Sequence, residues 1–132
     1  MLCPCKSHAT YDQCCKPFHD HKSTPQTPEQ LMRSRYSAYA LSKIDYIIET
    51  TDKGGPQYDP DLSAWKSSIA HFSQTTAFQN LTILENAPID ETTATVTFHA
   101  TLRSIRGEDL SYTEKSLFKK KKGRWLYHSR VI

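Results

Sequence analysis

The clearest fold signal in this chain is an alternating stretch, Thr95-Val96-Thr97-Phe98-His99-Ala100-Thr101-Leu102. Its apolar members, Val96, Phe98, Ala100 and Leu102, recur at every second residue, which places them on one face of a β-strand. A strand with one apolar and one polar face is typical of an antiparallel sheet that is covered on one side only. The stretch therefore predicts a half-buried sheet that needs other elements to cover its apolar face.

Further strands are expected on both sides of this stretch. Residues 78–84 are rich in β-forming side chains, and a turn is expected at Pro88-Ile89-Asp90-Glu91. Turns at Gly107-Glu108-Asp109 and Lys122-Gly123 bound two later strands, at residues 111–120 and 124–128. Together these segments predict a meander of about four antiparallel strands.

Helical patterns precede the strands. Thr27 can cap the first free amides of a helix, Pro28 suits the first turn, and Gln30 completes a capping box. Two more helix starts are expected, at Ser42 with Asp45 and at about Asp61. Helices followed by a strand meander define an α+β fold, in which the helices cover the sheet.

The cysteines form the most informative cluster. All four lie in the first 15 residues, with the spacing Cys3-x-Cys5-x8-Cys14-Cys15. Two disulfides there would staple only this loop, whereas four thiolates suit a closed tetrahedral metal site. Zinc is the first choice and iron fits the same donors. A closed shell leaves no position for a reacting water, so we favour a structural metal over free or redox thiols and over a catalytic metal.

Composition sets the remaining limits. The 132 residues suit one domain with a small appendage, and the net charge of +3 is too mild to indicate a nucleic-acid binder by itself. No apolar run approaches the roughly 18 residues of a transmembrane helix. The first residues lack the basic start and apolar run of a signal peptide. We therefore expect a cytoplasmic protein with no membrane contact.

The cysteine segment resembles a known motif. The stretch Cys3-Pro4-Cys5-Lys6-Ser7-His8-Ala9-Thr10-Tyr11-Asp12-Gln13-Cys14-Cys15 is similar to the SEC-C motif, a zinc knuckle also found at the C-terminus of the translocase motor SecA. The ligand spacing matches throughout, including Ser7 and Tyr11. Lys6 and His8 stand where the motif usually has glycine. The resemblance implies zinc on the four cysteines.

A longer resemblance covers nearly the whole chain. The segments Thr27–Tyr39, Asp45-Tyr46 and Gly123-Arg124-Trp125-Leu126-Tyr127 look like the YchJ-like bacterial proteins. The cysteine loop covers residues 1–20, and the polar, proline-containing residues 21–27 are typical of a linker. The family implies that the first is a knuckle and that residues 28–132 form a nuclear-transport-factor-2-like (NTF2-like) cone. In such a cone, helices pack on a curved antiparallel sheet. The resemblance implies a fold and a metal, and it assigns no activity.

A cone can enclose a pocket, and six side chains are candidates for its lining: Tyr36, Tyr39, Trp65, His71, Phe72 and Phe98. Their spacing is equally typical of a filled core, which we favour. If Trp65 belongs to such a core, Trp65→Ala should cost ~3–5 kcal/mol. On the cavity alternative, the cost falls below about 1 kcal/mol. His71 is the only acid–base candidate beside this face, and we assign no catalytic residue.

Basic side chains stand out in two places. Lys119, Lys120, Lys121 and Lys122 precede the Gly123 turn, where a solvated hairpin tip is the main interpretation and phosphate contacts are the alternative. Arg33 and Arg35 belong to the first long helix and are interpreted as surface residues. The alternative is a buried ion pair of Arg35 with Asp45 or Asp12.

Three functions follow as hypotheses. The first is a zinc-binding protein-interaction or scaffolding module with an unidentified protein partner, because the knuckle resembles one used for partner recognition in SecA. The second is a small-molecule binder or enzyme that uses the cone. The third is weak nucleic-acid binding through the lysines and the knuckle, which we consider the least favoured. A filled cone favours the first hypothesis, and an open cone with an inward acid or base favours the second.

Overall fold

An antiparallel meander of four strands forms one wall of the protein. The strands are β1 (Thr76–Asp90), β2 (Thr93–Ser104), β3 (Tyr112–Lys121) and β4 (Arg124–Arg130), and their order in the sheet is β1-β2-β3-β4. The structure is a computed structural model that describes residues 1–132. The expected α+β fold with four antiparallel strands is confirmed.

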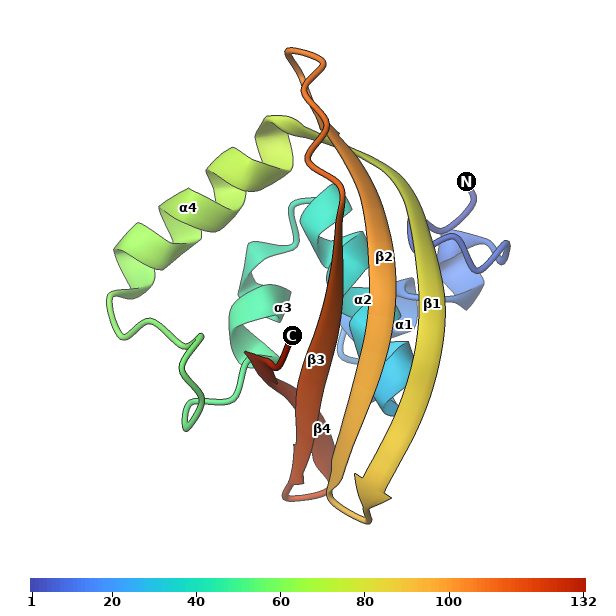
Figure 1. Ribbon diagram of the computed structural model, residues 1–132, viewed down its shortest axis with the longest axis vertical. Coiled ribbons are helices and arrows are strands. Elements are labelled where there is room, and N and C mark those ends of the chain that lie inside the picture. The colour runs from blue at the N-terminus through green and yellow to red at the C-terminus, as the bar shows by residue number, and fades with distance from the viewer.

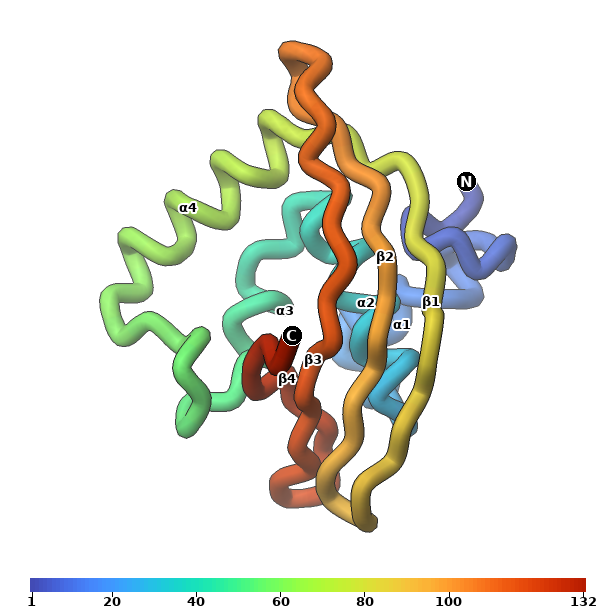
Figure 2. The backbone as a smooth tube through the Cα atoms, in the orientation of Figure 1, coloured from blue at the N-terminus to red at the C-terminus, as the bar shows by residue number.

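Four α-helices precede this sheet in the chain, and the last three lie on its concave side. They are α1 (Lys16–His19), α2 (Pro28–Ala40), α3 (Ile44–Glu49) and α4 (Leu62–Gln74), after a short 3-10 turn at Tyr11–Gln13. The strands curve around α2, while α4 stands to the side of the sheet (Figure 1). The chain path shows the N-terminal segment outside this arrangement (Figure 2). None of the helices combines the length and apolar composition needed to cross a lipid bilayer.

Two of the three expected helix starts are confirmed, and the third is wrong. The Thr27 side chain accepts from the Gln30 amide at 3.1 Å, and the Asp61 carboxylate accepts from the Ala64 amide at 3.1 Å. Ser42 instead adopts a left-handed backbone with φ 58°, and the next amide, of Lys43, donates to the Ala38 carbonyl at 2.8 Å. This pattern closes a helix C-terminus, so Ser42 ends α2 and does not begin α3.

The alternating stretch behaves as expected. Val96, Phe98, Ala100 and Leu102 of β2 are all buried against the helices. The turn predicted at 88–91 comes later, at Glu91-Thr92, because β1 continues through Pro88 to Asp90. β1 is an edge strand of the sheet, and an edge tolerates a residue that lacks an amide hydrogen.

The β3–β4 turn follows the sequence closely. Lys122 and Gly123 have φ of 53° and 77°, the pair of positive values that a type I′ hairpin turn requires. This turn twists with the strands and pairs Lys121 with Arg124. The four consecutive lysines therefore run from the end of β3 into the turn.

The main core joins α2 to the sheet. Its fully buried cluster consists of Leu31, Met32, Tyr36, Leu81, Val96, Phe98, Ala100, Leu102 and Phe118. The register places Tyr112 opposite Ala100, Glu114 opposite Phe98 and Ser116 opposite Val96. Since directly paired residues share a face, these polar members of β3 also face the concave side of the sheet.

Candidate functional site

The four cysteines of the knuckle (residues 1–20) converge at one point. Their Sγ atoms all lie within 4.8 Å of one another, and the Cys5–Cys14 and Cys14–Cys15 separations are 3.6 and 3.8 Å. A tetrahedron with metal–sulfur bonds of ~2.3 Å has sulfur–sulfur edges of about 3.8 Å. All four thiols are free of disulfides. The donor set therefore fits one four-coordinate metal ion.

The close packing of the thiols shifts their pKa values in opposite directions. Hydrogen bonds, foremost from Cys15, outweigh burial and lower the pKa of Cys5 to about 4. Burial raises the pKa of Cys14 to about 11, and the hydrogen bond to Cys5 together with burial raises the pKa of Cys15. A metal ion binds the deprotonated thiolates, so its binding would release protons from the cluster.

Two residues of the knuckle turn have left-handed backbone conformations. Lys6 and His8, which stand at the usual glycine positions, have φ of 64° and 73°. This is the left-handed region that glycine adopts without strain. Lys6 and His8 therefore adopt this conformation at a conformational cost that glycine would not have.

Hydrogen bonds attach the knuckle to α2. The Ser37 hydroxyl lies 3.3 Å from the Cys3 sulfur and donates to the Cys15 sulfur at 3.4 Å. The Arg33 guanidinium donates to the Cys5 carbonyl at 2.8 Å and to the Glu29 carboxylate at 2.9 Å. Arg33 is therefore the arginine at the knuckle junction, and the interpretation of Arg33 as a plain surface residue is wrong.

A buried histidine completes this contact. The His19 ring nitrogen Nε2 lies 2.8 Å from the Ser34 carbonyl, which can only accept, so Nε2 carries the proton. Nδ1 therefore accepts from the Tyr11 hydroxyl at 2.6 Å. Burial lowers the pKa of His19, which agrees with a neutral ring that bridges the knuckle and α2. Whether residues 28–132 fold without the knuckle stays a prediction.

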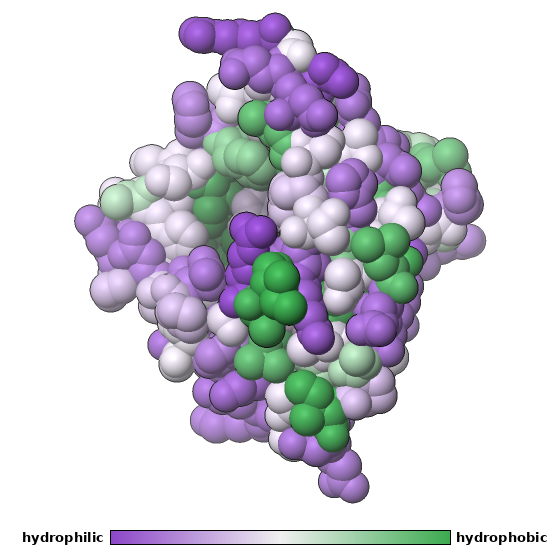
Figure 3. Space-filling model, in the orientation of Figure 1, coloured by the Kyte–Doolittle hydropathy of each residue, from purple (hydrophilic) through white to green (hydrophobic).

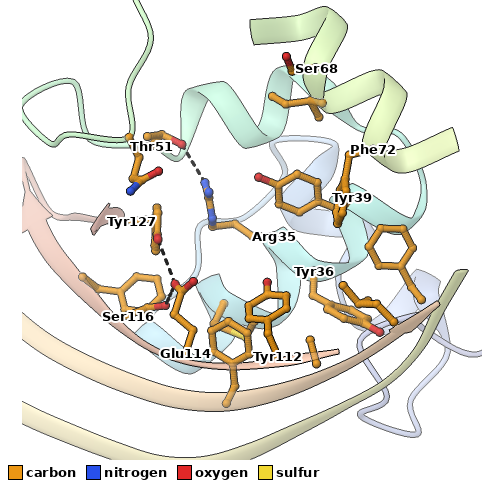
Figure 4. Close-up of a pocket in the computed structure, with 18 of the residues that line it drawn as sticks. Arg35, Tyr36, Tyr39, Thr51, Ser68, Phe72, Tyr112, Glu114, Ser116 and Tyr127 are labelled. Carbon is orange, nitrogen blue, oxygen red and sulfur yellow. Dashed lines mark hydrogen bonds between the residues drawn. The ribbon is translucent and has the colours of Figure 1, made fainter. Parts of the chain in front are cut away.

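A cavity of about 390 Å³ opens between α2, α4 and the concave face of the sheet. Figure 3 shows it as a recess with apolar residues inside, and Figure 4 shows the side chains around it. Of its 19 lining residues, 13 are hydrophobic, so the cone is partly open and its wall is mainly apolar. The lining consists of Met32, Arg35, Tyr36, Tyr39, Thr51, Gln57, Trp65, Ser68, Ile69, Phe72, Phe78, Phe98, Ala100, Leu102, Tyr112, Glu114, Ser116, Phe118 and Tyr127.

Five of the six candidate pocket residues line this cavity, namely Tyr36, Tyr39, Trp65, Phe72 and Phe98. His71 does not: it is exposed on α4. Successive helical residues differ by about 100° in direction, so when Phe72 faces the cavity its neighbour points away. His71 is therefore no candidate for acid–base chemistry in the cone.

Arg35 is the buried cation of the cavity wall. It is only 8% exposed, and its Nη1 donates to the Ile47 carbonyl at 3.0 Å and to the Thr50 and Thr51 hydroxyls at 2.8 and 3.1 Å. The protein's five ion pairs do not include Arg35. Both interpretations of Arg35, as a surface residue and as the partner of Asp45 or Asp12, are thus wrong.

Glu114 is the inward carboxylate that sequence reasoning missed. One of its oxygens accepts from the Tyr127 hydroxyl at 3.0 Å and from the Ser116 hydroxyl (Figure 4). Burial and the Glu114 charge raise the pKa of Tyr112 to about 12 and also raise that of Tyr127, so both phenols stay protonated. The available signal was the alternation along β3, in which Glu114 shares a face with Ser116 and Phe118.

The lysine tip (Lys119–Lys122) is partly engaged within the protein. The Lys121 ammonium lies 2.9 Å from a carboxylate oxygen of the buried Asp52, and the Lys120 ammonium lies over the Trp125 ring, 5.9 Å from its centroid. Burial would raise the pKa of Asp52, but hydrogen bonds from Lys121 and the Gly54 amide lower it. Two of the four charges thus have partners in the fold.

We expect the lysine tip to bind no short DNA duplex at ~150 mM salt, as measured by fluorescence anisotropy. Phosphate contacts would give affinities that fall steeply with salt, with a slope near −0.9 for each phosphate neutralised. Binding at this salt concentration that Lys119→Gln and Lys122→Gln abolish would establish the nucleic-acid hypothesis instead. Lys22→Gln, in the exposed linker, is the control for a nonspecific loss of charge.

A cysteine knuckle that leads into a cone of helices and curved sheet defines a class of protein, in which a SEC-C motif precedes an NTF2-like domain. Comparisons with known proteins agree. A family model described as the middle NTF2-like domain of YchJ matches residues 27–130. The chain therefore belongs to the YchJ family, as its resemblance to that family implied.

Individual relatives extend this similarity to the knuckle. A UPF0225 protein of Actinobacillus succinogenes is 41% identical over 132 residues, which cover 99% of this chain and 82% of the relative. The solution structure of a SEC-C motif containing protein from Rhodopseudomonas palustris has a TM-score of 0.83 at 35% identity, covering 99% of this chain and 98% of that one. The crystal structure of a SEC-C motif containing protein from Psychrobacter arcticus has a TM-score of 0.76 at 28% identity, covering 96% and 80%.

Proposed function

We propose that the cone of this protein binds a small, mainly apolar molecule and that the knuckle holds one structural zinc ion. The cavity carries the first proposal. Its volume of about 390 Å³ lies within the ~300–1,000 Å³ typical of ligand pockets. An apolar wall with a few polar groups, here Arg35 and Glu114, is the usual composition of such sites.

Zinc is supported by the chemistry of the donors. Four converging thiols provide four soft ligands and leave no open coordination position. This donor set suits zinc, because the zinc ion has no preferred geometry of its own and accepts the tetrahedron that the protein offers. Such a shell offers no open position to a substrate. The contacts of Ser37 with Cys3 and Cys15 give the knuckle a structural task, which is to anchor the N-terminus on α2.

Protein interaction and catalysis are the alternatives to this proposal. An open cone favours small-molecule binding over a filled scaffold, so protein interaction stays a prediction for the outer surface. An enzyme is the second candidate, and Glu114 is the observation in its favour. Its second carboxylate oxygen makes no hydrogen bond within the protein, so it is available as a proton acceptor on the cavity wall.

A neutral fluorescent probe, N-phenyl-1-naphthylamine, tests ligand binding. We expect saturable binding to the wild-type protein and at least a tenfold loss of affinity in Ala100→Phe. Ala100 is buried on the cavity wall, so a benzyl group there occupies the space that the probe needs. Thr101→Phe is the matched control, because the neighbouring residue of β2 points to the opposite face of the sheet.

NMR of isoleucine methyl groups keeps this test decisive if Ala100→Phe does not fold. In the wild-type protein the probe should shift the Ile69 methyl signal, since Ile69 lines the cavity. The Ile105 signal should stay in place, because that side chain is 71% exposed and lies outside the cavity lining. Saturable probe binding that leaves the Ile69 signal unmoved, or no binding at all, would overturn the proposal.

A further inference from the structure

The guanidinium of Arg35 is held rigidly at the cavity wall. Nη1 is occupied by three oxygen acceptors at the C-terminal end of α3. The Tyr127 ring lies under the group, 4.7 Å from its central carbon, and this stacking fixes the guanidinium plane. The orientation is thus set before any ligand arrives, which reduces the entropic cost of binding.

The other two nitrogens of Arg35, Nε and Nη2, have no partner in the protein. Two fully buried side-chain polar atoms lack a hydrogen-bond partner, Asp52 Oδ2 and Ser73 Oγ. Nε and Nη2 of Arg35 are not among them, so these two nitrogens are not fully buried. Arg35 lines the cavity, and Figure 4 shows its guanidinium at the cavity wall beside Thr51. Arg35 is only 8% exposed and forms no ion pair in the protein. Burying a charge without an opposite charge costs free energy, and a bound anion would offset this cost.

We propose that the cavity selects apolar molecules that carry one carboxylate and that Arg35 binds this carboxylate. This inference rests on the proposed ligand-binding function of the cone. Two adjacent nitrogens with their hydrogens in one plane match the two oxygens of a carboxylate. The apolar wall, rich in aromatic side chains such as Tyr39 and Phe72, receives the body of the ligand.

Glu114 further limits the class of ligand that the cavity can bind. It is a second charged group of the cavity wall and is negative, so it disfavours ligands with two or more negative charges, such as phosphate monoesters. Its unbonded oxygen accepts hydrogen bonds, which suits a ligand with a hydroxyl or amino group away from the carboxylate. The geometry thus points to a monocarboxylate with an aromatic or branched aliphatic body.

Two probes of nearly equal shape test this inference on the whole protein: 2-naphthoate and its neutral analogue 2-naphthamide. Isothermal titration calorimetry should show that wild-type protein binds 2-naphthoate at least tenfold more tightly than 2-naphthamide. Arg35→Gln should reduce this ratio to one or less, and Arg35→Lys should retain only part of it, because an ammonium is a point charge without the planar fork. Arg103→Gln, which alters an exposed arginine outside the cavity, should leave the ratio unchanged.

The outcomes separate the two proposals. Equal affinities of wild-type protein for both probes, with the Ile69 methyl signal shifted, would overturn carboxylate selection and leave ligand binding intact. Failure of both probes and of the neutral naphthylamine would overturn ligand binding itself. The comparison of the two probes on wild-type protein needs no variant, so it decides the question even if the Arg35 variants do not fold. A preference for 2-naphthoate that survives Arg35→Gln would contradict the role given to Arg35.

Discussion

Cys14→Ser is expected to release the metal and unravel residues 1–20, while residues 28–132 stay folded. Structural zinc supplies about 10–16 kcal/mol to small zinc-binding peptides, and a 20-residue knuckle cannot replace this with apolar burial. Cys14 is the best choice because it is the least buried of the four ligands. Its side-chain partners are Ser7, Cys5 and Cys15, all within the knuckle.

Elemental analysis and amide hydrogen exchange measure this result. Wild-type protein should contain about one equivalent of zinc or iron, and Cys14→Ser should contain none, with exchange increased only in residues 1–20. Ser7→Ala is the matched control: it removes the 3.1 Å contact to the Cys14 sulfur and should lower metal affinity by no more than about 10–100-fold. Global unfolding of Cys14→Ser would show that the contacts of His19 and Arg33 with the cone are essential, and the domain boundary would then be wrong.

Phe118→Ala is expected to destabilise the cone by ~3–5 kcal/mol, the usual cost of removing a buried phenylalanine side chain. Phe118 is 1% exposed and belongs to the cluster that joins α2 to the sheet. Since small domains have about 5–15 kcal/mol of total stability, this one change should leave the protein marginal. Urea denaturation followed by circular dichroism gives the change in free energy of unfolding.

Trp65→Ala is the informative comparison. The indole is partly exposed, meets the Tyr58 ring edge-on at 5.2 Å and lines the cavity, so we expect a cost below about 1 kcal/mol. This corresponds to the cavity alternative for Trp65 and not to the filled core. A cost of ~3–5 kcal/mol in Trp65→Ala would show that the cone closes around this side chain in solution, and the ligand-binding proposal would lose its basis.

The candidate site was only partly predictable. The helical and alternating spacing of apolar residues predicted that Tyr36, Phe72 and Phe98 face the interior, because this periodicity shows which side chains share one face of a helix or strand. Period does not distinguish a cavity wall from a filled core. Arg35 and Glu114 were misjudged or missed, since charged side chains are seldom buried and their partners are remote in the chain.

The sequence by itself determined the α+β class, the strand meander, two of three helix starts and the four converging cysteines. These features depend on neighbours within a few residues, through side-chain period, capping, turn conformation and ligand spacing. Only the tertiary structure decided that the cone is open and that an unpaired Arg35 and the carboxylate of Glu114 line the same cavity. Those properties arise where α2, α4 and β3 meet, and the volume left between packed elements depends on all of their side chains at once.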